Sequence, residues 1–261
     1  MARVDLANAY RLADRPIEAA EVAEEAVLVL DRLGEQDPAN DTRFLLAGLY
    51  REIGDQAGAL DLYRDLIERL TDNPAGRGQI GAELGGLLYD LDRDAEAAQA
   101  FRAAAADLHE AGDLVGELRL LRRLVSALHY ADEVDQAEEA VRLAAERFAA
   151  LPPEVAAEPE AIWQQGMTAF EAGRLLSIRA RHADALPHLR GVPDRLQAIG
   201  AGDDADRVEL LLAEALLRTG AVPDAEVLLT GLLDRLPADG PARRAAAELL
   251  AETTNEPPPT S

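Results

Sequence analysis

The same arrangement of apolar and small residues occurs six times along the chain, and this repeat constrains the fold more than any other feature. Each copy is marked by an Ala that follows a short polar turn, and these residues lie 40, 38, 40, 48 and 40 positions apart. A unit of this length cannot bury its own apolar surface, so the copies must stack on one another. The marker residues are Ala19, Ala59, Ala97, Ala137, Ala185 and Ala225.

Each copy carries two apolar stripes at helical spacing, one before the turn and one after it. Hydrophobic residues make up 48% of the chain but aromatic residues only 4%, so Ala, Leu and Val must build the core. Ala and Leu favour helices, and we expect no strands. The position thirteen residues before the marker is followed by a mostly small residue, which predicts two antiparallel helices that cross closely. That position holds Leu6, Leu46, Leu84, Leu124, Ala172 and Leu212.

This pattern resembles the tetratricopeptide repeat family over nearly the whole chain. The third copy carries the family signature at Leu84, Gly85, Ala97, Phe101 and Ala104. The chain departs from the family in its longer period, in the missing Trp of the signature and in a closing Pro that is present only at Pro237. The resemblance implies an all-α, right-handed superhelix, or α-solenoid, of about six helix hairpins with a C-terminal capping helix. The lengthened repeats resemble those of bacterial regulators and motor light chains.

The domain organisation follows from the repeat and from the positions of proline. We expect four repeats in residues 1–150, a Pro-rich loop or hinge in 151–162, two repeats in 163–237, a capping helix in 238–252 and a disordered tail in 253–261. Trp163 follows the Pro-rich segment and lies outside the repeat register, either as a buried staple or as a ligand anchor.

The composition excludes several kinds of chemistry. All 26 basic residues are Arg, and the chain has no Lys and no Cys. Schiff-base chemistry, a P-loop and thiolate sites are therefore ruled out. The histidines do not form a metal-binding pair, since His182 and His188 are six residues apart and are expected in loops or at the surface. We expect no enzymatic activity, no metal and no cofactor.

The charge balance bears on the partner. The net charge is −23 and the isoelectric point about 4.5, which argues against nucleic acids and anionic membranes as partners. No apolar run approaches the length of a membrane span, and the N-terminus lacks the apolar region of a secretory signal. These features predict a soluble, cytoplasmic chain, and the use of Arg alone suggests a GC-rich bacterial genome.

In the predicted hairpins, one face of the first helix has a charge balance opposite to that of the whole chain. Positions that would point into a concave groove carry more Arg than acidic residues, and such a patch suits an acidic peptide. Alternatively, these Arg side chains pair with Asp and Glu of adjacent repeats. The predicted partner-binding residues are Arg11, Phe44, Arg51, Tyr89, Arg119, Arg122, His129, Phe170, Arg174 and Arg207.

These observations predict a non-enzymatic interaction scaffold that binds an acidic segment of a partner protein in an Arg- and aromatic-lined groove. The sequence leaves two alternative functions and the oligomeric state open. The chain could instead be a ligand- or peptide-sensing repeat domain of a bacterial regulator. It could associate with itself through a terminal repeat. Its oligomeric state does not follow from the sequence.

Overall fold

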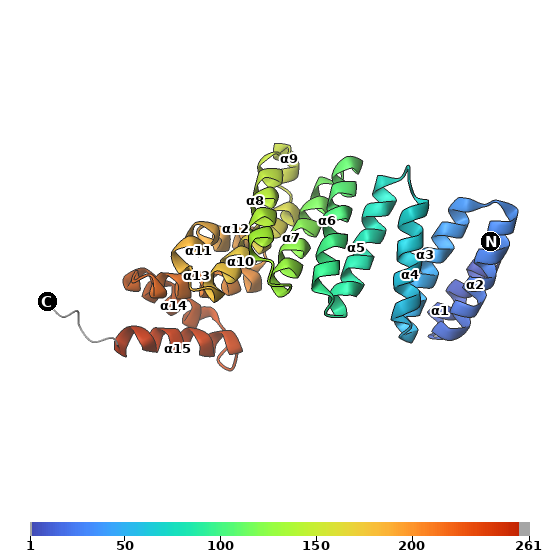
Figure 1. The fold of residues 1–261 in the computed structure, drawn as a ribbon. Helices are drawn as coiled ribbons and strands as arrows, with labels where there is room; N and C mark the ends of the chain where they lie inside the picture. The colour runs from blue at the N-terminus through green and yellow to red at the C-terminus, as the bar shows by residue number, and fades with distance from the viewer. Residues whose placement is uncertain (1, 256–261) are drawn as a thin grey trace. The chain divides into compact units, whose positions relative to one another are not determined.

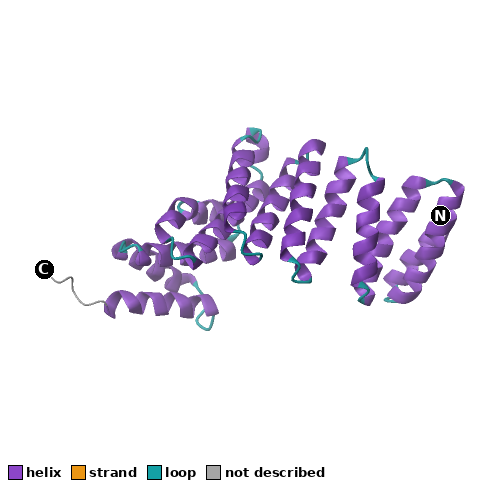
Figure 2. Ribbon diagram, viewed as in Figure 1, coloured by secondary structure: helices purple, strands orange, loops and turns teal. Residues whose placement is uncertain are grey.

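A computed structural model describes residues 2–255, and every element within this range is a helix. Figure 2 shows these helices connected by short loops, with no strand in the described range. The predicted all-α architecture of six helix hairpins and a final capping helix is confirmed.

In each hairpin we call the first helix the A helix and the second the B helix (Figure 1). The first four hairpins are α1 (Ala2–Leu12) with α2 (Pro16–Leu33), α3 (Gln36–Ile53) with α4 (Gln56–Arg69), α5 (Pro74–Asp90) with α6 (Asp94–Ala111), and α7 (Leu114–Tyr130) with α8 (Val134–Ala149). The next A helix, α10 (Pro159–Ile178), pairs with a B helix that is divided into α11 (His182–Leu189) and α12 (Val192–Ala198). The sixth hairpin is α13 (Gly202–Arg218) with α14 (Val222–Arg235), and α15 (Pro241–Asn255) packs against it.

The turn inside every hairpin has the same backbone geometry. Five residues before each marker Ala, the chain adopts a left-handed conformation with φ between 57° and 84°. The next residue donates its backbone N–H to a carbonyl at the end of the A helix, over 2.8–3.0 Å. This bond satisfies a carbonyl that the helix end would leave unpaired. The left-handed residues are Asp14, Gly54, Asp92, Asp132, Ala180 and Gly220.

The helices of a hairpin cross as closely as the small residues predict. All six marker Ala residues are 0% exposed. In the third hairpin, a Cβ atom added to Gly85 would lie 2.6 Å from Cδ1 of Phe101, which is itself buried. In the fifth hairpin, a Cβ atom on Gly173 would lie 2.6 Å from Leu189. The sequence register is therefore correct, and a larger residue at either glycine would force the facing side chain to shift.

The chain divides into two compact units between Leu120 and Leu121, inside α7. Unit 1 contains α1 to α6, and its first hairpins share a core that includes Ala7, Ala23 and Leu49. Unit 2 contains α8 to α15, and its largest core cluster is formed by residues from α10 to α14. The division lies about one helix hairpin upstream of the Pro-rich segment, which sequence analysis favoured as the boundary.

The Pro-rich segment is more helical than the sequence suggested. Residues 153–156 form the short helix α9, and α10 begins at Pro159, so the loop expected over 151–162 is limited to a few residues. Pro153 and Pro159 both stand in the first turn of a helix, where the missing N–H breaks no intrahelical bond. A hinge at this segment stays a prediction.

The last helix is displaced from its expected range of 238–252. It begins at Pro241 because residues before it form a turn, in which Gly240 donates its N–H to the carbonyl of Pro237. It ends at Asn255, and the hydroxyl of Thr253 donates to the carbonyl of Leu250. The expectation of disorder is therefore wrong for residues 253–255, and the rest of the predicted tail lies outside the described residues.

Candidate functional site

All ten predicted partner-binding residues lie on A helices, as expected. The division of the chain distributes them between the two units. Unit 1 holds Arg11, Phe44, Arg51, Tyr89 and Arg119, whereas unit 2 holds Arg122, His129, Phe170, Arg174 and Arg207. The two sets are therefore described separately.

In unit 1, Phe44 borders a pocket between α3 and α5. The side chain of Phe44 is 41% exposed, and its ring centroid lies 6.2 Å from that of the buried Tyr63. The pocket has a volume of about 180 Å³ and combines apolar with amide side chains. It is lined by Asn40, Asp41, Phe44, Leu66, Leu70, Asn73, Gly76, Gln79 and Ile80. A single apolar side chain of a partner has room to enter it.

The sequence left open whether the Arg side chains of unit 1 bind a partner or pair with acidic residues of adjacent repeats, and the structure shows both situations. Arg51 donates to Glu83 over 2.7 Å and lies 3.7 Å from Asp90, so it joins α3 to the next A helix. Arg11 is exposed and makes no ion pair with any residue in the range 2–255. Arg119 is exposed and Tyr89 half-buried, and both interact with other residues of the chain.

In unit 2, three guanidinium groups lie over aromatic rings. The distances from the guanidinium carbon to the ring centroid are 5.1 Å for Arg122 over Trp163, 5.4 Å for Arg174 over Tyr130 and 5.3 Å for Arg207 over Phe170. Contacts of this kind are attractive because the negative face of the ring meets the cation. The six residues come from α7, α10 and α13, the three A helices that contribute to this unit. We call them the stacked-arginine face.

Polar bonds orient the three guanidinium groups. Arg122 donates to the side chain of Gln164 over 2.9 Å, and Arg174 donates to Glu171 over 2.8 Å. Arg207 lies 3.2 Å from Asp204, which also accepts the indole N–H of Trp163 over 2.7 Å. Arg174 and Arg207 therefore have carboxylate neighbours on their own helix, and Arg122 donates to a neutral amide on α10.

His129 borders the stacked-arginine face. Its ring meets that of Tyr130 edge-on, with centroids 5.2 Å apart. Burial lowers the pKa of His129, and the nearby charges of Arg174 and Arg179 lower it further. The buried Nδ1 atom has no hydrogen-bond partner among the described residues.

Two aromatic members of this face were not among the predicted partner-binding residues. The sequence left Trp163 open as a buried staple or a ligand anchor; it packs against the core cluster of unit 2, is half-buried and lies under the guanidinium of Arg122. Its spacing of seven residues from Phe170 would have placed both on one side of α10. Tyr130 is 56% exposed and lies eight residues after Arg122, a spacing that also keeps one helix face.

No helix within residues 2–255 combines the length and the apolar character needed to cross a membrane.

Comparison with known proteins identifies the fold. No protein-family profile matches the chain, and no curated protein sequence matches it. Among solved structures, BtubC (BKLC) from P. vanneervenii is similar with a TM-score of 0.62 and 20% identity, over 93% of this chain and 94% of that one. The apo form of RapI is similar with a TM-score of 0.60 and 12% identity, over 97% and 95% of the two chains.

A third similar structure is that of a kinesin light chain-type protein from Podosopora anserina with nearly identical TPR-like repeats. Its TM-score is 0.55 and its identity 19%, over 77% of this chain and 95% of that one. These likenesses show that the chain has a tetratricopeptide-type helical fold.

Proposed function

We propose that the chain is a non-enzymatic scaffold that binds a segment of a partner protein on its A-helix faces. The observation that carries this proposal is the stacked-arginine face of unit 2, with three guanidinium–ring pairs from three successive A helices. Stacked helix hairpins expose the side chains of successive A helices in a row, and repeat proteins use such rows as extended binding surfaces.

The stacked-arginine face favours a segment that contains acidic residues. A guanidinium over the face of a ring uses its π surface for that contact, and its N–H donors are left for a carboxylate, which can accept two of them. The side chain of Arg207 is 58% exposed, so its donors are accessible. An incoming carboxylate would compete with Asp204 at Arg207 and with Glu171 at Arg174. The exposed ring of Tyr130 offers apolar area beside them.

In unit 1, the proposed contacts are Phe44 with its pocket, Tyr89, Arg51 and the exposed Arg11. The pocket has room for one apolar side chain, and the amide groups of Asn40, Asn73 and Gln79 line it. Amide side chains both donate and accept hydrogen bonds, so they are suited to the backbone of an extended segment. The net charge of −23 supports a protein partner rather than a nucleic acid.

The test is a selection of randomly composed displayed peptides on the purified chain. Enriched peptides should contain Asp or Glu next to an apolar residue. Their affinity should fall about tenfold or more in Arg207→Ala and Arg174→Ala, the change expected when one charged hydrogen bond is lost.

The matched control is Arg190→Ala. Arg190 is exposed in unit 2 but is a residue of neither the stacked-arginine face nor any A helix, and its side chain has no partner in the described range. This variant should bind the selected peptides as the wild type does. Peptides without acidic enrichment, or equal affinities in all three variants, would remove the stacked-arginine face from the proposal.

A further inference from the structure

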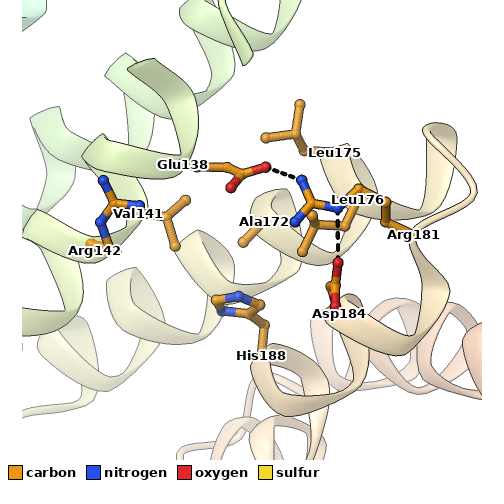
Figure 3. A pocket seen from close by; sticks show the side chains of 9 residues that line it. All are labelled: Glu138, Val141, Arg142, Ala172, Leu175, Leu176, Arg181, Asp184 and His188. Atoms are coloured by element: carbon orange, nitrogen blue, oxygen red, sulfur yellow. Dashed lines mark hydrogen bonds and ion pairs between the residues drawn. The ribbon is translucent and has the colours of Figure 1, made fainter. Parts of the chain in front are cut away.

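Unit 2 contains a second pocket, formed where α8 and α11 meet α10 (Figure 3). Its volume is about 200 Å³, and none of its residues belongs to the stacked-arginine face. It is lined by Glu138, Val141, Arg142, Ala172, Leu175, Leu176, Arg181, Asp184 and His188.

The pocket exists because one repeat lacks a large residue that the others have. Ala172 occupies the position thirteen residues before the marker, where the other five repeats have Leu. Ala172 is 2% exposed, so its missing carbons leave space inside the structure rather than at its surface. The fifth hairpin is unusual in a second way, because its B helix is interrupted near the left-handed Gly191 and α11 has only 8 residues, whereas the undivided B helices have 14 to 18.

The lining separates into an apolar part and a network of ion pairs. Val141, Leu175 and Leu176 join Ala172 in the apolar part, and all four are buried. Arg181 donates to Asp184 over 2.8 Å and also pairs with Glu138, as the dashed lines in Figure 3 show. Arg181 pairs with two carboxylates, so this network carries one net negative charge, and the positive charge of Arg142 brings the charge of the lining to zero.

Two further polar residues of the lining, the exposed Arg142 and the half-buried His188, have side chains that bond to no described residue. Arg142 makes no ion pair and no side-chain hydrogen bond with any residue the structure describes. His188 was expected in a loop or at the surface, but it lies half-buried in α11 because the helix continues through Pro187. Burial lowers the pKa of His188, which keeps its ring neutral with one N–H to donate. The side chain of His188 has no hydrogen-bond partner within residues 2–255.

We propose that this pocket binds a compact apolar carboxylic acid in its anionic form. The branched aliphatic or phenyl group of the acid occupies the space over Ala172, against Leu175 and Leu176. Its carboxylate accepts hydrogen bonds from Arg142 and His188, which supply the donors and the positive charge. The volume is below the range of ordinary small-molecule sites, so the ligand carries one compact group and no second ring. Such a group occurs in a free acid and at the C-terminus of a peptide that ends in Leu or Phe.

The test measures binding of 3-methylbutanoate and phenylacetate to the full chain by methyl NMR and calorimetry. We expect shifts and ligand contacts at the methyl groups of Leu175 and Leu176. 3-Methylbutanamide should bind at least tenfold more weakly because it lacks the charge. A tetrapeptide ending in Leu, with a free or an amidated C-terminus, distinguishes the two sources. Tighter binding of the free-ended peptide than of the small acids would assign the pocket to chain termini.

Substitutions in the lining test whether the acid binds in this pocket. Ala172→Leu restores the residue of the other repeats and should abolish binding, and the smaller Ala172→Val should weaken it. Arg142→Gln should weaken binding of the acids about tenfold without changing the weak binding of the amide. Arg190→Gln, a change of the same charge outside the lining, should leave binding unchanged. Equal binding of acid and amide, wild-type affinity in both Ala172 variants, or no contacts at Leu175 and Leu176 at millimolar acid would overturn the proposal.

Discussion

Two glycines in A helices provide a matched test of the helix crossing. A methyl group added at Gly48 in α3 meets nothing within 4 Å, whereas one added at Gly85 in α5 lies 2.6 Å from two ring carbons of Phe101. Replacing a helical Gly by Ala stabilises a helix by about 1 kcal/mol. Gly48→Ala should therefore stabilise the protein by about that amount.

At Gly85 the same helical gain is opposed by overpacking. Forcing a methyl group into a packed site costs about 1 to 3 kcal/mol, and the buried Phe101 has little room to move. Gly85→Ala should therefore range from neutral to destabilising by about 2 kcal/mol. The difference between the two changes in the free energy of unfolding gives the cost of overpacking at the helix crossing, because the helical gain is the same in both variants.

Urea unfolding followed by circular dichroism at the helical band measures both variants against the wild type. The double variant Gly85→Ala/Phe101→Leu should show a favourable coupling of about 0.5 to 3 kcal/mol, because the smaller side chain relieves the clash. Equal stability changes at Gly48 and Gly85, or no coupling with Phe101, would refute the close crossing.

Three further outcomes are expected from the same structure. Ala180→Gly should stabilise the protein by about 0.5 to 1 kcal/mol in urea unfolding, because Ala180 has φ 57°, a conformation that strains Ala but not glycine. Ala97→Leu should lower the melting temperature through a loss of about 1 to 3 kcal/mol, since Ala97 is 0% exposed, and an unchanged melting temperature would contradict the register. Burial lowers the pKa of His129 and of His188 below the ordinary 6.5, so the unfolded chain binds protons first as the pH falls, and the free energy of unfolding should decrease from that pH downward. Replacing both histidines by Gln should flatten this dependence, as measured by urea unfolding at a series of pH values.

Much of the fold could be predicted because the repeat encodes it locally. The marker Ala, the small residue and the turn lie within one hairpin, and their spacing alone defines which side chains meet. The role of proline could not be predicted in the same way. Pro159 is compatible with either a loop or the first turn of a helix, and the residues that follow it in α10 decide between them.

The candidate site was predictable only in part. Spacing placed Arg122, Arg174 and Arg207 on A helices, but the ring under each guanidinium belongs to a different helix. Such pairs depend on how neighbouring helices pack, which one sequence does not specify. The sequence carries one indication of the pocket over Ala172, because the other five repeats have Leu at this position. The residues that line the pocket could be identified only from the structure.

The left-handed turn that closes every hairpin has a consequence for how the protein folds. Each turn joins two helices that are adjacent in the chain, so the bond that ends the A helix forms between residues only five positions apart. Most contacts that build a unit are thus short in sequence separation, and the contact order is low. Chains of this kind close no long loops before packing begins, and they fold quickly. Folding can begin at any of the hairpins and extend to its neighbours.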